Sequence, residues 1–120
     1  MDKEKDGMYM GRGKEKSYKY DEGKTRMSLV PPSLIRAVGV IRTYGTAKYN
    51  NDPDGWLKVE KVRYKDALMR HLMDYLEDED SHDEESGFKH LWHIACNVAF
   101  LIEMQEMEAK GVVTEDELFG

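Results

Sequence analysis

The sequence predicts an all-α protein, built as a small bundle of three main helices. Apolar residues recur at the three-and-four spacing of a helix face in three long segments, and nothing reads as a confident strand. All three prolines lie at or before residue 53, so no proline interrupts a helix in the second half of the chain. With 120 residues, the chain forms a single small domain with a modest core.

The N-terminal residues have no helical pattern. Residues 1–18 (MDKEKDGMYMGRGKEKSY) combine many charges with three glycines, which predicts a flexible N-terminal arm. Residues 19–120 are then expected to form one helical domain. Its first part is turn-rich, because Gly23 and the pair Pro31–Pro32 exclude a long regular element.

The first helix is predicted to begin near Ser33, a good N-cap residue directly after Pro32. It should end near Tyr44–Gly45, because glycine permits the left-handed residue that closes many helices. The face predicted to point inward consists of Leu34, Ile35, Val38, Ile41 and Arg42. The segment TAKYNNDPDGW has Asn, Asp, Pro and Gly in the order of a turn and is predicted to be a loop.

Two longer helices follow, from about Lys58 to Leu76 and from about Gly87 to Ala109. The inward stripe of the earlier helix is Val62, Tyr64, Leu68, His71, Leu72 and Tyr75. The later helix has two apolar faces, one of Phe88, Leu91, Trp92, Ala95, Ala99 and Ile102, the other of Ile94, Leu101 and Met104. A helix that is apolar nearly all round needs neighbours on every side, and three helices supply few. We therefore expect a homo-oligomer that completes the bundle.

Charge and composition exclude several classes of protein. The formal net charge of −6 argues against general nucleic-acid binding, which needs clustered Lys and Arg. No apolar run reaches the roughly 18 residues of a membrane span. A single cysteine, Cys96, fits a reducing compartment, so we expect a cytoplasmic protein, and on the packed face this thiol should be inert. Seven acids in residues 77–85 predict a solvated loop or a cation-binding edge.

Histidines interrupt the apolar stripes of both long helices. His90, His93 and Asn97 are spaced to share one side of the later helix, and His71 lies within the stripe of the earlier one. If the two helices form an antiparallel hairpin, these residues can meet near Asp83 and Glu85. Three interpretations remain open: hydrogen-bonded core histidines, contacts to a nucleotide base, or a metal site. Asn97 favours base contacts, because its amide both donates and accepts hydrogen bonds.

A second group of residues fits nucleotide binding through cations and aromatic rings. Aromatic side chains stack on bases, and Lys or Arg beside them hold phosphates. Surface solubility and core packing are the simpler alternatives. The cations are Lys24, Arg26, Lys48 and Arg70, and the aromatic residues are Tyr20, Tyr44, Tyr49 and Trp56.

Four blocks of the sequence resemble, in order, a mostly bacteriophage family, the dATP/dGTP diphosphohydrolase N-terminal domain. The blocks are KYDEGKTRMSLVPP, YGTAKY, ALMRHL and DEESGFKHLWHIACNVAFL. The resemblance implies cleavage of a deoxynucleoside triphosphate to the monophosphate and pyrophosphate, the chemistry of the all-α MazG-like pyrophosphohydrolases, with Mg²⁺ or Mn²⁺ as cofactor. It makes residues 19–120 a domain that binds a purine nucleotide, in the cytoplasm of an infected bacterial host.

The resemblance also implies roles for individual residues. The implied phosphate contacts are Lys24, Arg26, Lys48 and Arg70. The implied pocket residues, which hold a metal or read a base, are His71, Asp83, Glu85, His90, His93 and Asn97. We assign catalysis to Asp83, Glu85 and His71, metal binding to Asp83, Glu85 and His90, and further nucleotide contacts to Tyr44, Tyr49 and Trp56.

One departure from the MazG-like pattern leaves the function open. The ExxE…ExxD carboxylate set is absent from these helices, and Arg70–His71 and His90–His93–Asn97 stand in its place. The oxygens come from Asp83, Glu85 and Asp74, or the chemistry uses another metal, or there is no metal. The first alternative to an enzyme is a non-catalytic nucleotide-binding protein that sequesters a nucleotide immune signal for anti-defence. The second is a structural oligomerisation module.

Overall fold

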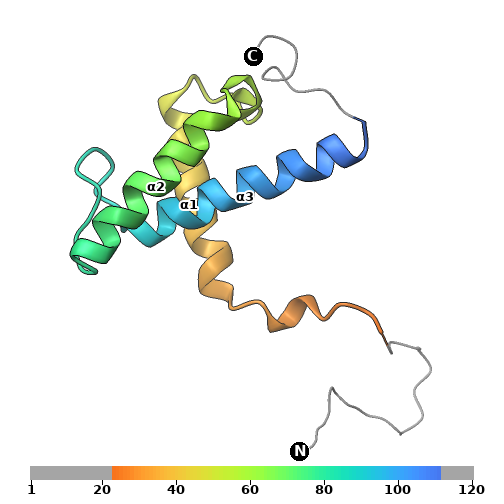
Figure 1. Ribbon diagram of the computed structural model, residues 1–120, viewed down its shortest axis with the longest axis horizontal. Helices are drawn as coiled ribbons and strands as arrows, with labels where there is room; N and C mark the ends of the chain where they lie inside the picture. Colours follow the sequence, from red (N-terminus) through yellow and green to blue (C-terminus); the bar gives the residue numbers. More distant parts are fainter. Residues whose placement is uncertain (1–22, 112–120) are drawn as a thin grey trace, which may run out of the picture.

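A computed structural model describes residues 23–111 and confirms the predicted all-α bundle of three helices (Figure 1). The helices are α1 (Pro32–Lys48), α2 (Lys61–Glu77) and α3 (His90–Ala109). Two short 3-10 helices, η1 (Met27–Leu29) and η2 (Gly55–Lys58), precede α1 and α2. Within residues 23–111 there is no strand, only an isolated bridge between His82 and Lys89. The predicted arm, residues 1–18, lies outside the described residues.

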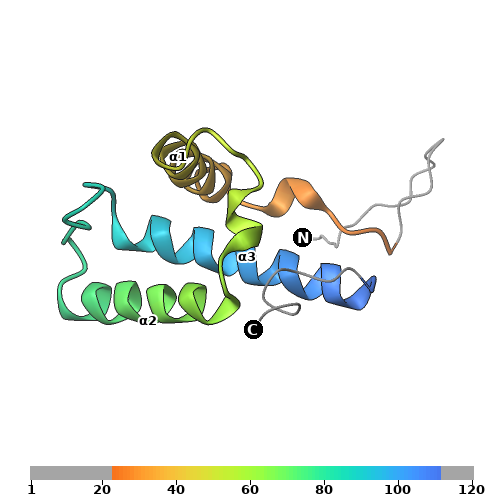
Figure 2. The ribbon, with the colours of Figure 1, turned by 90° about the horizontal axis from the view of Figure 1, so that it is seen from above.

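Helix α3 is the centre of the bundle. It packs against both α1 and α2, and α2 and α3 lie side by side while α1 crosses them (Figure 2). The core has Ala37 and Ile41 from α1 and Cys96 and Met104 from α3. Because residues 78–89 connect α2 directly to α3, the two helices form the expected hairpin, and their facing side chains border the site described below.

Helix α1 is longer at its C-terminal end than predicted. Gly45 stays helical, and the helix continues to Lys48. The chain reverses only at Asn50 and Asn51, whose φ angles of 64° and 56° are left-handed. Asparagine is one of the few residues other than glycine that tolerates this conformation, so the two asparagines end the helix instead of Gly45.

The predicted start and inward face of α1 are wrong in part. The helix begins at Pro32, with Pro31 at the N-cap, and no side chain caps it, so Ser33 is not the cap. The fixed φ of proline suits a first helical position, which accounts for this start. Leu34 and Ile35 are exposed, whereas Ala37 and Ile41 are buried, because α1 crosses α3 through its middle and not through its first turn (Figure 1).

Helix α2 begins three residues later than predicted because residues 55–58 form η2. The hydroxyl of Tyr64 donates a hydrogen bond to the carbonyl of Trp56 at 2.5 Å and ties η2 to α2. Val62 was predicted to point inward and is exposed. The remaining stripe residues, Tyr64, Leu68, His71, Leu72 and Tyr75, are half-buried as predicted.

Helix α3 begins at His90 and not at Gly87, because Gly87 has a φ of 80° and lies in the preceding turn. Of the two apolar faces predicted for this helix, Leu91 and Ile102 are exposed within one chain, whereas Met104 is the most deeply buried. Among residues 23–111, no helix combines the length and apolar character needed to cross a membrane.

Candidate functional site

A cavity of about 600 Å³ opens between α1, η2, α2 and α3. Its walls change in character along the length of α3. Tyr64, Trp56 and Phe100 line one part with aromatic rings, and His71, Asp83 and His93 line another with groups that bind protons or metals. The cavity therefore has an aromatic end and a polar end.

The connection between α2 and α3 builds the polar end. Residues 82–89, which we call the 82–89 turn, fold back through hydrogen bonds from the Asp83 N–H to the Phe88 carbonyl at 2.8 Å and from the Gly87 N–H to the Asp83 carbonyl at 2.7 Å. Gly87 is left-handed, a conformation that costs a residue with a Cβ roughly 1–2 kcal/mol. The turn thereby holds Asp83 at the mouth of the α2–α3 hairpin.

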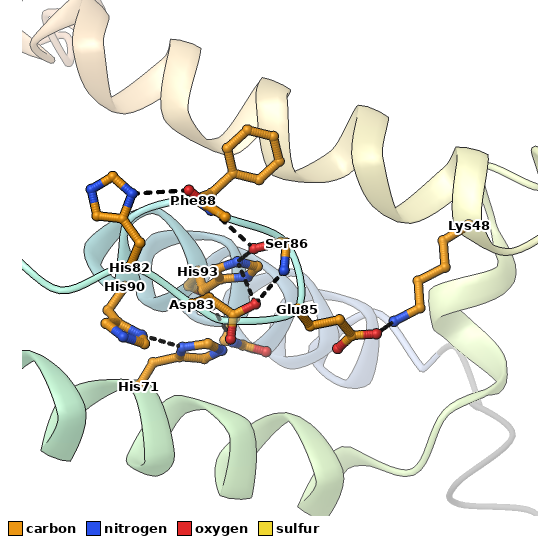
Figure 3. Close-up of polar contacts among 11 residues, drawn as sticks. Lys48, His71, His82, Asp83, Glu85, Ser86, Phe88, His90 and His93 are labelled. Carbon is orange, nitrogen blue, oxygen red and sulfur yellow. Dashed lines mark hydrogen bonds and ion pairs between the residues drawn. The ribbon is translucent and has the colours of Figure 1, made fainter.

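Three imidazoles meet where the turn contacts the two helices (Figure 3). Nδ1 of His71 on α2 lies 2.9 Å from Nδ1 of His90 on α3. The ring of His71 also stacks on that of His93, with centroids 4.5 Å apart and planes at 4°. His90 is 5% exposed and is more deeply buried than the half-buried His71 and His93. The hairpin predicted from the sequence has thus brought the histidines of both helices together.

Asp83 joins this cluster through Ser86. The Ser86 N–H donates to Oδ2 of Asp83 at 2.8 Å, and the Ser86 hydroxyl oxygen lies 2.7 Å from Nε2 of His93. The same hydroxyl oxygen accepts a hydrogen bond from the Phe88 N–H at 3.2 Å, so Ser86 links the backbone of the turn to both Asp83 and His93. Oδ2 of Asp83 is 3.8 Å from Nε2 of His93.

The electrostatics of the cluster favour neutral His71 and His93 beside a charged Asp83. Burial, reinforced by the neighbouring histidines, lowers the pKa of both His71 and His93 below the ordinary value. Burial alone would raise the pKa of Asp83, but the hydrogen bonds from Ser86, with His93 and His71 nearby, outweigh it and lower that pKa. Near neutral pH the cluster therefore offers imidazole lone pairs and a carboxylate, which are the donors that bind metal ions.

Glu85 lies apart from the histidines. Its carboxylate forms an ion pair with Lys48 of α1, and this contact raises the pKa of the lysine (Figure 3). The Lys48 ammonium also lies 5.8 Å from the ring centroid of Tyr44 and 5.4 Å from that of Tyr49. This ion pair bridges α1 and the 82–89 turn and borders the polar end of the cavity.

At the aromatic end, Phe100 of α3 is the common partner. Trp56 stacks on it with ring centroids 4.8 Å apart, and Tyr64 packs at 4.9 Å. The guanidinium of Arg42 lies 5.3 Å from the Phe100 ring centroid and donates to the Pro53 carbonyl at 2.7 Å. These contacts fix η2 over the bundle and leave an apolar wall on the cavity.

Asn97 lies on α3 between the two ends. It is 8% exposed, and its Nδ2 donates to the His93 carbonyl at 2.9 Å. Its side-chain oxygen has no hydrogen-bond partner within the part of the chain that the structure describes. A buried acceptor of this kind costs free energy unless a ligand or water donates to it.

The structure brings together most of the predicted site residues, and three lie elsewhere. Those lining the cavity are Tyr44, Lys48, Tyr49, Trp56, Arg70, His71, Asp83, Glu85, His93 and Asn97. Lys24 and Arg26 are exposed on the segment before α1 and do not line it. His90 does not line it either, but contacts His71, which does.

Sequence reasoning missed several residues of the site. Arg63 lines the cavity from α2, and it lies seven residues before Arg70, a spacing that puts both cations on one helix side. Ser86, which orients Asp83 and His93, follows directly after Glu85 but was not considered. Arg42 was assigned to packing only, and Phe100 was not singled out.

Cys96 borders the cavity but is 3% exposed, and burial raises its pKa to about 11. Compared with the ordinary thiol pKa of 9.0, this shift lowers the thiolate fraction at pH 8 about 100-fold. We expect folded protein to react with a thiol reagent such as DTNB at least about 100-fold more slowly than urea-unfolded protein. Equal rates in the two states would contradict the inert, buried thiol.

Comparisons with known proteins agree with the sequence blocks. A sequence model of one family, described as "dATP/dGTP diphosphohydrolase, N-terminal", matches residues 14–113 and confirms the resemblance. A curated relative from Salmonella phage PMBT28, named "dATP/dGTP diphosphohydrolase", is 35% identical over 83 residues. The match covers 69% of this chain and 28% of the relative, so the chain spans less than a third of that protein. No solved structure matches the chain.

Proposed function

Since the chain belongs to the dATP/dGTP diphosphohydrolase N-terminal family, we propose that it binds a purine deoxynucleoside triphosphate and takes part in its cleavage to the monophosphate and pyrophosphate. One observation carries this proposal: a single cavity has stacked aromatic rings at one end and cations, imidazoles and a carboxylate at the other. A nucleotide has the same division into an apolar base and a charged phosphate chain. The site would act in the cytoplasm of an infected host.

The dimensions of the cavity support this orientation. Seven residues of α3 separate His93 from Phe100, which corresponds to about 10 Å of helix. A base against Trp56 and Phe100 would leave its phosphates near Lys48 and Arg70. Between the ends, the unpartnered oxygen of Asn97 can accept a hydrogen bond from a base or ribose.

The donor set does not fit the all-oxygen magnesium cage of MazG-like enzymes. Asp66, Asp74, Asp83 and Glu85 line the cavity, yet in residues 23–111 the one group of donors that converges is His71, Asp83 and His90. Mg²⁺ prefers oxygen ligands and retains its waters, whereas Mn²⁺ accepts imidazole as well as carboxylate. Of the two ions expected from the family, Mn²⁺ is the better match.

The function is tested by incubating purified protein with dATP or dGTP in the presence of Mn²⁺ or Mg²⁺. Formation of the monophosphate and pyrophosphate in equal amounts supports the proposal. dCTP and dTTP serve as matched substrates that test the purine preference. If no nucleotide is cleaved and none raises the melting temperature at 100-fold excess over a micromolar Kd, where about 2.7 kcal/mol is expected, the proposal fails.

Binding without catalysis is the second candidate function. The absence of a converging carboxylate cage in the described residues favours it, because the cavity then retains its cations and aromatic rings without the usual catalytic metals. A protein of this kind could sequester a nucleotide signal from a host defence system. Tight binding of a nucleotide that is recovered unchanged identifies this alternative.

Trp56 provides a direct measure of where the base binds. In a Trp92→Phe variant, Trp56 is the single tryptophan left, and dGTP should quench its fluorescence. In the matched Trp56→Phe variant, Trp92, which packs on Phe88 and does not line the cavity, should not respond. Trp56→Ala should weaken binding by about 1–3 kcal/mol, the usual value for one stacked base. Quenching of Trp92 alone would place the base elsewhere.

Self-association completes the proposal. Exposed apolar side chains follow one side of α2 at Val62, Met69, Met73 and Leu76 and one side of α3 at Leu91, Val98 and Ile102. Uncovered apolar stripes are typical of interaction surfaces. We propose that a second copy of the chain covers them. Light scattering should show an oligomer that Met73→Lys reduces to a monomer and that the control Met27→Lys, at an exposed methionine outside the stripes, preserves.

A further inference from the structure

We propose that His71, Asp83 and His90 form a binding site for one divalent transition-metal ion, of the class that includes Mn²⁺, Fe²⁺, Co²⁺ and Zn²⁺. The inference deepens the proposed function by naming the kind of ion. Only the role of the ion in nucleotide cleavage rests on the proposed function, because metal binding itself can be measured without a nucleotide.

The donors converge from three separate elements. One ligand atom each from His71 of α2, Asp83 of the 82–89 turn and His90 of α3 lie within 4.8 Å of one another. Residues on two different helices and the connecting turn are not neighbours through helical spacing. The packing of α2 against α3 therefore brings these three donors together. The turn is already held by its own hydrogen bonds, which keep Asp83 facing both imidazoles.

The separation of the two imidazole nitrogens is close to that of two ligands on one ion. Metal–nitrogen bonds of about 2.1 Å with angles between 90° and 109° place neighbouring ligand atoms roughly 3.0–3.4 Å apart. Nδ1 of His71 and Nδ1 of His90 are 2.9 Å apart. A shift of a few tenths of an ångström would therefore admit an ion. Without an ion, one of the two nitrogens has to donate its proton to the other.

The surroundings resemble the outer shell of a metal site. Asp83 is oriented by the Ser86 N–H, and Ser86 also holds His93, which stacks on His71 and fixes the plane of that ring. Such contacts orient metal ligands and raise affinity, and losing one typically costs 10–100-fold.

The arrangement leaves room for substrate on the ion. His90 is buried behind the cluster, whereas His71 and Asp83 line the cavity. Three protein ligands would occupy one side of the ion and leave the side toward the cavity open, as in catalytic sites with three protein ligands. Two nitrogen donors and one carboxylate select transition metals over Mg²⁺, which prefers oxygen.

The test uses protein stripped of metal with a chelator and titrated with Co²⁺, whose visible absorption reports nitrogen and oxygen ligands, and with Mn²⁺ and Zn²⁺ by calorimetry. We expect one ion per chain and no displacement of Co²⁺ by millimolar Mg²⁺. His71→Gln and Asp83→Asn should each weaken Co²⁺ binding by at least 100-fold. Ser86→Ala should weaken it by roughly 10–100-fold.

His82 provides the matched control. It belongs to the same turn, but its Nδ1 lies 3.0 Å from the Gly87 carbonyl and it points away from the other histidines (Figure 3). His82→Gln should bind Co²⁺ within about twofold of the original protein. Circular dichroism identifies variants that have lost their fold. His71 is substituted in preference to His90 because it is half-buried, and a change at the buried His90 is more liable to unfold the protein.

Two outcomes overturn the site. One is the absence of stoichiometric Co²⁺, Mn²⁺ and Zn²⁺ binding to folded protein; the other is binding that His82→Gln reduces as much as His71→Gln. The metal titration and the nucleotide cleavage assay are run on the same preparations, so failure of the metal site can be told apart from failure of the proposed function. Metal binding without nucleotide cleavage supports the metal site and contradicts the proposed enzymatic activity. Nucleotide cleavage with Mg²⁺ by protein that binds no Co²⁺ supports the enzymatic activity and contradicts the metal site.

Discussion

Asp83→Asn should lower the proposed cleavage of dATP or dGTP by on the order of 10²–10³-fold, the usual loss when a charge-stabilising group is removed. Asp83 is the carboxylate that converges with the histidines. Asparagine has nearly the same shape and can still accept the hydrogen bond from the Ser86 N–H, so the 82–89 turn should persist. The loss should appear in kcat measured at saturating nucleotide.

Asp80→Asn is the control for this prediction. Asp80 precedes the same turn and carries the same charge, but it is exposed and does not line the cavity. We expect its kcat to stay within about twofold of the original value, as for surface substitutions remote from a site. Full activity in Asp83→Asn, or an equal loss in both variants, would show that Asp83 has no part in the reaction.

Met104→Ala should destabilise the fold by about 2–5 kcal/mol, the range for truncating a buried methionine or leucine. Met104 is 1% exposed, the lowest value among the few residues that form the core. Small domains have only about 5–15 kcal/mol of stability in total, so this change removes a large part of it. Urea unfolding followed by circular dichroism measures the change.

Met27→Ala makes the same chemical change at a methionine that is 73% exposed. It should alter the free energy of unfolding by less than about 0.5 kcal/mol, since no buried contact is lost. If both variants lost the same stability, the packing of α3 against α1 and α2 would not be what holds the domain together.

The helices were predictable because their patterns are local. The three-and-four spacing located α1, α2 and α3, with boundaries off by up to four residues. The errors have tertiary causes. Leu34 and Ile35 satisfy the pattern of an inward face, but which turn of α1 is covered depends on where α1 crosses α3, and spacing along one helix does not encode that crossing.

The site was predictable to the extent that it depends on the α2–α3 hairpin. Once the two helices are antiparallel, His71 can lie near His90 and His93, and the structure brings the three together. The partner of Glu85 was not predictable, because Lys48 is 37 residues away and reaches it only through the crossing of α1. Glu85 therefore pairs with Lys48 and not with the histidines. The three donors that converge are His71, Asp83 and His90, where the sequence predicted Glu85 in place of His71.

The 82–89 turn has one more consequence. Backbone hydrogen bonds join Asp83 to both Phe88 and Gly87 in the absence of any ligand. The entropy of ordering Asp83 is therefore spent during folding, and an incoming ion or nucleotide does not have to supply it again. Preorganisation of this kind lowers the entropic cost of binding, so Gly87, whose left-handed backbone permits the turn, would affect affinity without touching the ligand.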